Sequence, residues 1–358
     1  MLYKGEFDMN FKKTICFFLS ITILSAFSGC SFNFFNKNKN EEASQTETSD
    51  SLSNEELQSK VSALESELSD LKAQTKPSLV PKSKADFING KDNPQVSVAV
   101  KAKEQAMSNL PATITIKGVE YSTSLTSLTL NNMDLTDNDI KDLKYMVNLT
   151  DLHIYMNKIT DLSPLTGLTE LKTLSLFRNK ITDISPLAGL YNLEVLYLRD
   201  NNISDISPLA GLTKLTKLDI SENDITDISA LSEMSSMNLL RINNNKIKDI
   251  SPLEGMYKID RLHMQCNQIS DLTPLWKMTD ITEIYAENNQ IADITILGDL
   301  NNLKWLKLSD NPIKDLSPIY NLHTLKKLWI AGIELKNTAD YNQLKDMQEQ
   351  LPDCQINT

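Results

Sequence analysis

The chain has 358 residues, of which 41% are hydrophobic and 23% are charged, and its net charge is −11 at pH 7. These values are typical of one long soluble domain with additional segments. The acidic balance argues against a nucleic-acid partner and against a basic surface that binds membranes.

The first segment, residues 1–29, is predicted to be a signal peptide. Met9 is a second candidate start, so residues 1–8 need not be translated; two lysines and the apolar run 14–27 follow Met9. A basic start, a short apolar core and small residues before the cleavage site are typical of secretory signals. The apolar run is too short for a membrane span.

Cys30, which directly follows Ser28 and Gly29, resembles the lipobox of bacterial lipoproteins. That family attaches lipid to this Cys and cleaves the chain before it. Phe27 departs from the Leu that usually stands three residues before the Cys. The resemblance implies a lipid anchor on the extracellular face of the bacterial plasma membrane. The alternative is an ordinary signal peptide with an incidental Cys.

The other cysteines indicate neither a disulfide nor a metal site. Cys16 lies in the signal, and Cys266 and Cys354 are three repeats and a cap apart. Their spacing matches no zinc or haem motif. We therefore expect no metal and no cofactor.

Three segments connect the signal to the main domain. Residues 30–51 are polar and are expected to form a disordered tether. Residues 52–74 begin with the capping box Ser53–Glu56 and are predicted to form a helix. The apolar residues of this helix have coiled-coil spacing and are Leu57, Val61, Leu64, Leu68 and Leu71. About three heptads leave two readings open, a solvated spacer helix and weak self-association. Residues 75–95 contain three prolines and are expected to be a linker.

The next segment, residues 96–124, is predicted to cap the main domain. We expect a helix over 102–110 and a strand over 113–116. The repeat that follows is irregular, because Met133 stands where later repeats have Asn, and 139–146 is expected to be helical. A cap is needed because the first repeat of an array otherwise exposes its core.

Residues 125–330 form an array in which the phrase Leu-x-x-Leu-x-Leu-x-x-Asn-x-Ile-x-Asp recurs every 22 residues from residue 149 on. Its Asn position is filled by Asn157, Asn179, Asn201, Asn223, Asn245, Asn267, Asn289 and Asn311. Its Asp position is filled by Asp161, Asp183, Asp205, Asp227, Asp249, Asp271, Asp293 and Asp315. A fixed period in this range predicts a solenoid in which neighbouring repeats bury a common core.

The chemistry of one repeat predicts its local structure. Leu174 and Leu176 alternate with polar residues, so they leave one face of a short strand. The following Asn can satisfy backbone groups of the turn. Ser185 is expected to cap a short helical turn with Pro186 in its first position, and Gly189 is expected to end it.

The C-terminal segment, residues 331–358, is predicted to be a second cap. The last strand is expected between Leu325 and Ile330, and 341–351 has the pattern of an amphipathic helix. That helix and the apolar end through Ile356 would cover the last open repeat.

The phrase Asn-x-Ile-x-Asp-Ile-x-Pro-Leu resembles the leucine-rich repeats of internalins, a family of bacterial surface proteins. The resemblance covers about residues 125–330 and implies a curved solenoid that binds a partner protein on its concave sheet face. A C-terminal Leu-Pro-x-Thr-Gly wall anchor is missing, so the host-invasion role of some internalins is not inferred. The same repeat class occurs in intracellular phosphatase regulators, but the export signal argues against that setting.

The third, fifth and seventh positions of the phrase point away from the core, and they define the concave face. Candidate protein-binding residues on this face are Tyr155, Phe177, Tyr197, Arg199, Arg241, Tyr285, Trp305, Lys307 and Trp329. Exposed aromatic residues are typical of binding hot spots. The alternative is that they cover one another. Lateral ion pairs are expected between Asp219 and Arg241 and between Arg261 and Glu283.

Catalytic chemistry is not supported by these positions. His153 and His263 are five repeats apart, about 24 Å at the strand spacing, and cannot share a metal. Glu283 and Glu287 are about 13 Å apart along one strand, which exceeds the spacing of glycosidase carboxylates. We find no phosphate loop or nucleophile elbow. We therefore predict a protein that is not an enzyme.

Together these patterns predict a curved α/β leucine-rich-repeat solenoid, capped at both ends. Each repeat is expected to supply one short parallel strand to the concave face and a short helical or 3-10 turn to the convex face. The expected function is that of a lipid-anchored extracellular protein that binds another protein, with adhesion to host cells or matrix as one role. The alternative is a structural or sensing role in the bacterium's own envelope.

Overall fold

The computed structural model describes residues 94–335 and 342–358. The predicted signal peptide, Cys30, the tether, the spacer helix and nearly all of the predicted linker lie outside these residues. In the described part of the chain, no helix is both long enough and apolar enough to cross a membrane.

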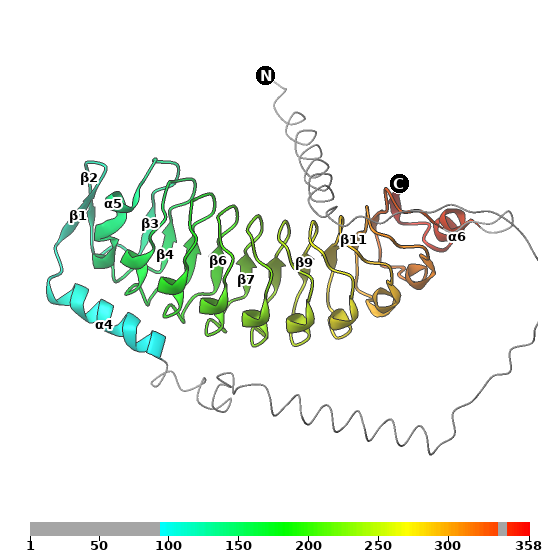
Figure 1. Ribbon diagram of the computed structural model, residues 1–358, viewed down its shortest axis with the longest axis horizontal. Helices are drawn as coiled ribbons and strands as arrows, with labels where there is room; N and C mark the ends of the chain where they lie inside the picture. Colours follow the sequence, from blue (N-terminus) through cyan, green and yellow to red (C-terminus); the bar gives the residue numbers. More distant parts are fainter. Residues whose placement is uncertain (1–93, 336–341) are drawn as a thin grey trace, which may run out of the picture. The chain divides into compact units, whose positions relative to one another are not determined.

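Eleven strands form one parallel sheet in which each strand pairs with the next along the chain (Figure 1). Their bounds are β3 Ser127–Thr129, β4 Asp151–His153, β5 Thr173–Ser175, β6 Val195–Tyr197, β7 Lys217–Asp219, β8 Leu239–Arg241, β9 Arg261–His263, β10 Glu283–Tyr285, β11 Trp305–Lys307, β12 Lys327–Trp329 and β13 Gln355–Asn357. From β4 to β12 the register joins residues 22 apart, as in the pair Leu174 and Leu196, whereas β3 pairs with β4 at an offset of 24 residues. The period of the sequence is therefore the register of the sheet, and the predicted curved solenoid is confirmed.

The inward side chains of the strands build one continuous core. Leu174, Leu176 and Leu196 are fully buried, and so are the Ile residues that follow each Asn, such as Ile203. Since each repeat contributes apolar side chains at the same positions, each layer packs on a similar layer. This arrangement explains why single repeats have no core of their own.

The row of Asn side chains hydrogen-bonds the backbone between repeats, as predicted. The Nδ2 atom of Asn201 donates to the carbonyls of Leu176, at 3.1 Å, and of Leu198, at 2.9 Å. Its Oδ1 atom accepts from the backbone N–H of Ile181 at 3.0 Å. Each Asn thus satisfies buried backbone groups of its own repeat and of the preceding one.

The residue before each of these Asn residues has a left-handed backbone conformation. It is never glycine in the regular repeats; Asp200, for example, has a φ of 58°. The chain turns sharply at this point, immediately after the strand, and the Asn that follows is directed into the array.

Short 3-10 turns form a second row along the array (Figure 1). Their bounds are η2 Ser163–Leu165, η3 Ser185–Leu187, η4 Ser207–Leu209, η5 Ser229–Leu231, η6 Ser251–Leu253, η7 Thr273–Leu275, η8 Thr295–Asp299 and η9 Ser317–Ile319.

The capping of these turns differs from the prediction. Ser185 is the first residue of η3 and not its cap. The carboxylate of Asp183 accepts hydrogen bonds from the backbone N–H of Ser185 at 2.8 Å and from its hydroxyl at 2.9 Å. The Asp of the phrase therefore starts the turn, because its side chain reaches a residue two positions ahead. Gly189 follows the C-cap Ala188, but its φ is not positive.

The N-terminal cap contains more structure than was predicted. Helix α4, Pro94–Ser108, begins eight residues before the predicted helix and includes the end of the predicted linker. The predicted strand is β1, Thr113–Ile116, and it pairs with a second strand, β2, Val119–Ser122, in an antiparallel hairpin. The single helix expected over 139–146 is replaced by α5, Asp137–Ile140, and the 3-10 helix η1, Lys141–Tyr145.

Helix α4 lies directly against the first regular turn of the array. A β-carbon added to Gly167 would stand 2.8 Å from the backbone nitrogen of Lys103. The Lys103 side chain also forms an ion pair of 2.7 Å with Glu170. Glycine is required at residue 167 because the helix backbone occupies the space of a side chain.

The C-terminal cap closes the other end. Helix α6, Gln343–Gln350, lies within the predicted helix 341–351, and its Met347 is fully buried in the core. Strand β13 pairs with β12 and extends the sheet by one strand. This last pairing was not predicted, because Gln355–Asn357 does not carry the repeat phrase.

Candidate protein-binding face

The outward side chains of the strands form the concave face, and their environments differ from repeat to repeat. The predicted residues Tyr155, Phe177, Tyr197, Arg199, Arg241, Tyr285, Lys307 and Trp329 are all half-buried, and Trp305 is 43% exposed. All of them lie on the strands or within two residues of a strand end. The sheet therefore carries every predicted residue on a rigid backbone, but it separates them into distinct groups.

The group nearest the N-terminal cap is aromatic. The rings of Tyr155 and Phe177 are stacked, with centroids 4.1 Å apart and planes inclined by 14°. They partly cover one another, as the alternative reading of the sequence expected. Tyr197 lies on β6, the strand after β5, and is also half-buried. This group presents a ring surface with a fixed orientation.

The middle of the face is a chain of polar contacts that crosses four strands. Arg241 contacts Asp219 at 3.7 Å and donates from Nε to the Nδ1 atom of His263 at 3.3 Å. The Nε2 atom of His263 lies 2.8 Å from Oε1 of Glu283. Since Nδ1 accepts from Arg241, the proton of a neutral imidazole lies on Nε2 and is donated to Glu283.

Burial controls the protonation of this histidine. Desolvation lowers the pKa of His263, and the hydrogen bond to Glu283 opposes that effect without overcoming it. Asp219 and Glu283 are themselves buried, at 7% and 6% exposure. The carboxylates in the middle of the face are thus largely inaccessible to solvent.

One of the two expected lateral ion pairs is present and the other is not. Asp219 pairs with Arg241, as predicted. Arg261 is level with Glu283 in the register, but it contacts Asp260 at 3.5 Å. The carboxylate of Glu283 turns instead toward His263. Register places backbones side by side, but the direction of a long side chain depends on all its neighbours.

The group nearest the C-terminal cap combines aromatic rings with a lysine. Tyr285 is stacked on His263, with centroids 4.3 Å apart. The Nζ atom of Lys307 lies 4.1 Å from the ring centroid of Tyr285 and 4.9 Å from that of Trp329. An ammonium group between two rings is held by cation–π attraction. Lys307 also contacts Glu287 at 3.6 Å, and burial raises the pKa of this carboxyl group.

Metal-binding side chains do not gather into one site in the part of the chain that the structure describes. Within 94–335 and 342–358, no group of three or more His, Cys, Asp or Glu side chains could hold a metal ion. Both ring nitrogens of His263 already have protein partners, namely Arg241 and Glu283.

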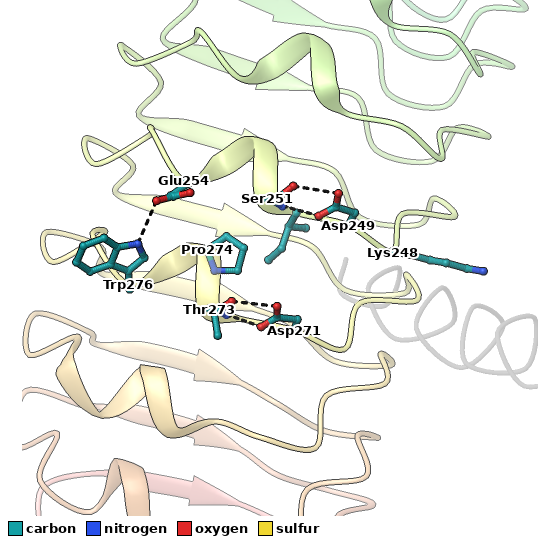
Figure 2. Close-up of a pocket in the computed structure, with 9 residues that line it drawn as sticks. Lys248, Asp249, Ser251, Glu254, Asp271, Thr273, Pro274 and Trp276 are labelled. Atoms are coloured by element: carbon teal, nitrogen blue, oxygen red, sulfur yellow. Dashed lines mark hydrogen bonds between the residues drawn. The ribbon is translucent and has the colours of Figure 1, made fainter. Parts of the chain in front are cut away.

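A shallow hollow of about 270 Å³ lies between η6 and η7, away from the strands (Figure 2). Trp276, which is 50% exposed, donates to Glu254 at 3.4 Å beside it. The carboxylates of Asp249 and Asp271 bond to Ser251 and Thr273 of their own turns. Trp276 was not among the predicted binding residues, although most other repeats carry a small residue at this position. The carboxylates of Asp249 and Asp271 are therefore already bonded within their own turns.

Comparisons with known proteins agree with this architecture. A family model described as "Leucine Rich repeats (2 copies)" matches residues 147–189, 169–211, 191–233, 213–255 and 235–275. A comparison with the sequences of curated proteins finds no match. The repeats, the single parallel sheet and the row of 3-10 turns define a leucine-rich-repeat protein.

Solved structures identify the family within this class. An internalin (InlF) from Listeria monocytogenes is 31% identical, with a TM-score of 0.62, over 77% of this chain and 78% of that chain. The functional domain of InlJ from the same organism is 22% identical, with a TM-score of 0.55, over 76% of this chain and 56% of that chain. A third structure is the ectodomain of the plant receptor kinase GASSHO1/SCHENGEN3 from Arabidopsis thaliana in complex with CASPARIAN STRIP INTEGRITY FACTOR 2. It is 18% identical, with a TM-score of 0.50, over 60% of this chain and 30% of that chain. The chain belongs to the internalin family.

Proposed function

We propose that this internalin-family chain binds a folded partner protein across its concave face. The observation that carries the proposal is the placement of partly exposed aromatic side chains on one rigid sheet. These residues are Tyr155, Phe177, Tyr197, Tyr285, Trp305 and Trp329. Large aromatic side chains that are held in place lose little conformational freedom on binding, and for that reason they dominate many interfaces.

The separation of the two aromatic groups supports a protein as the ligand. Tyr197 lies on β6 and Tyr285 on β10, four strands further along the sheet. At the usual strand spacing this is about 19 Å. A small molecule cannot contact both groups at once, whereas a folded domain can.

The polar middle of the face supports a role in orientation. Arg199, Arg241 and Arg261 keep 39%, 35% and 41% of their side chains exposed although each has an acidic neighbour. Charged groups at such positions align a partner before the aromatic contacts form. Affinity would then come from the aromatic groups and orientation from the charges.

The experiment is a pull-down with the protein lacking residues 1–29, compared with its Phe177→Ala/Trp305→Ala variant. Capture of a host-cell or matrix protein by the unaltered protein alone would support adhesion. Capture of components of the bacterium's own envelope alone would favour the structural or sensing role. Equal capture by both proteins would contradict a concave binding site.

We further propose that Cys30 carries lipid and anchors the protein to the extracellular face of the plasma membrane. The support is the sequence Ser28-Gly29-Cys30 after a short apolar run. A Cys30→Ala variant should be released from membranes or remain unprocessed, as measured by fractionation and by the mass of the protein. Normal processing together with membrane retention of this variant would contradict the anchor.

A further inference from the structure

The concave face has a charge balance opposite to that of the chain. The whole chain has a net charge of −11. In contrast, the outward positions on and next to β6–β12 carry the basic residues Arg199, Lys217, Arg241, Arg261, Lys307 and Lys327. The acidic residues at outward positions of these strands are fewer, and they are Asp219, Glu283 and Glu287.

The acidic groups of this surface are withdrawn from solvent. Asp219 and Glu283 are buried and bonded to Arg241 and His263. Glu287 has a side chain that is 19% exposed, and it lies against Lys307. A partner that approaches the sheet would therefore meet few free carboxylates.

The basic groups, in contrast, protrude. Lys217 and Lys327 are exposed, and neither has an ion-pair partner among the residues that the structure describes. Arg261 keeps 41% of its side chain exposed beside Asp260. All three occupy the third position of the phrase, on β7, β9 and β12, so they form one row across the sheet.

Other residues separate these cations within the row. Leu239 lies between Lys217 and Arg261 in the register. Between Arg261 and Lys327 lie Glu283, which is buried against His263, and the exposed Trp305. Successive cations are two and three strands apart, about 10 Å and 14 Å at the usual spacing. A polyphosphate chain is best matched by closely spaced cations, whereas a folded protein presents carboxylates interrupted by apolar groups. The spacing therefore favours a protein.

From this arrangement we infer that the concave row is a docking surface for an acidic protein surface. The inference rests on the proposed function and specifies its partner. Carboxylates of the partner pair with Lys217, Arg261 and Lys327, and its apolar groups contact the exposed ring of Trp305. Unpaired exposed cations give little stability to the fold itself, so their charges are available to a ligand at small desolvation cost.

Tryptophan fluorescence can report binding to this face directly. The chain contains three Trp residues, and only Trp276 lies away from the concave face. In a Trp276→Phe background the emission therefore comes from Trp305 and Trp329. The probes are a soluble Glu/Tyr copolymer, a Lys/Tyr copolymer of equal length, and inorganic polyphosphate, each titrated at low and at high salt.

We expect the Glu/Tyr copolymer to change the emission at low salt and to lose affinity as salt rises. A Lys217→Glu/Lys327→Glu variant should bind at least tenfold more weakly. The control variant, Lys248→Glu/Lys258→Glu, makes the same change in net charge at exposed lysines outside the face and should bind as before.

Three results would overturn the inference. A response to the Lys/Tyr copolymer alone would leave a protein-binding face but reverse the charge of its partner. Polyphosphate binding that is as tight as copolymer binding, and equally weakened in the variant, would assign the row to phosphate polymers. No response to any probe would refute the inference that the row binds an acidic protein surface. The proposed function would still be tested separately, by the pull-down with the Phe177→Ala/Trp305→Ala variant.

Discussion

The inward and outward side chains of a single strand differ in burial and in how far their residue type can vary. On β6, Leu196 points into the array and is fully buried, while its neighbour Tyr197 points outward and is half-buried. The inward position holds Leu or Ile in every regular repeat, because each layer must fit the layers beside it. The outward position holds His, Ser, Tyr, Asp, Arg, Lys or Trp. The repeat thus constrains the scaffold and leaves the binding surface free to vary.

The comparison is tested most strongly by the inward residue. Leu196→Ala should destabilise the fold by about 2–5 kcal/mol, because it leaves a cavity between two layers that cannot collapse independently. The measurement is urea unfolding followed by circular dichroism. Tyr197→Ala on the same strand is the matched control and should cost clearly less. Equal losses for the two variants would contradict the difference between the faces.

The Asn row should give the next largest effect. Asn201→Ala removes the hydrogen bonds to Leu176, Leu198 and Ile181. The buried backbone groups would lose their partners, at a cost of about 1–3 kcal/mol. The same unfolding experiment measures it. A change below about 0.5 kcal/mol, the usual range for surface substitutions, would show that water replaces the amide.

A third test compares two glycines that occupy the same position of the repeat but have different neighbours. Gly167 and Gly255 occupy the same place after the 3-10 turn, but only Gly167 lies under the backbone of α4. Gly167→Ala should cost about 1–3 kcal/mol through overpacking. Gly255→Ala, whose β-carbon would meet its nearest neighbour at 3.6 Å, should be nearly neutral. Equal thermal shifts in the two variants would refute the assigned contact of α4.

The outward aromatic residues should affect binding more than folding. Once a partner is captured, Phe177→Ala and Trp305→Ala should each weaken binding by at least about 1 kcal/mol if they are hot spots. Trp305→Ala should leave stability unchanged, whereas Phe177→Ala also removes the stack with Tyr155, worth about 0.5–1.5 kcal/mol. Calorimetry of binding, together with unfolding of each free variant, measures both. Loss of binding only on substitution of the convex turns would place the site elsewhere.

The smallest effect concerns pH. The pKa of His263 is lowered by burial between Arg241, Glu283 and Tyr285, so the folded state binds its proton less readily than the unfolded chain, near pH 6.5. Stability should therefore fall as pH decreases below about 6.5, by at most about 1.4 kcal/mol per pH unit for one proton. His263→Gln should flatten this decline. His323→Gln, at an exposed side chain, should not; equal pH profiles for both variants would contradict the assignment.

The sequence allowed the periodic features to be predicted in detail. A period of 22 fixes the strand register, and the Asn position follows because a turn in a stacked array buries the same backbone groups each time. The features that were missed are those that do not repeat, namely the start of α4, the partner strand β2 and the pairing of β13. The start of α4 and the pairing of β13 depend on surfaces that exist only after the array has formed. Strand β2, in contrast, forms a local hairpin with β1 through the two-residue turn of Lys117 and Gly118, both of which have positive φ.

The concave face could be predicted only in part, for a related reason. Alternation along the strands from β4 to β12 gave the positions that face away from the core. It could not show that Glu283 turns to His263 rather than to Arg261, nor that Lys307 lies between two rings. Those arrangements depend on the combined packing of side chains from three or four repeats, and each such combination occurs once in the chain.

The constant offset of 22 residues from β4 to β12 has a consequence for how such a protein can change over generations. Unequal recombination between two regular repeats would add or remove a whole 22-residue unit and join equivalent positions, so that core layers of the same kind would still pack together. Each event lengthens or shortens the face by about 4.8 Å. The distance between the two aromatic groups can therefore change in steps of one repeat, while the side chains of each group stay the same.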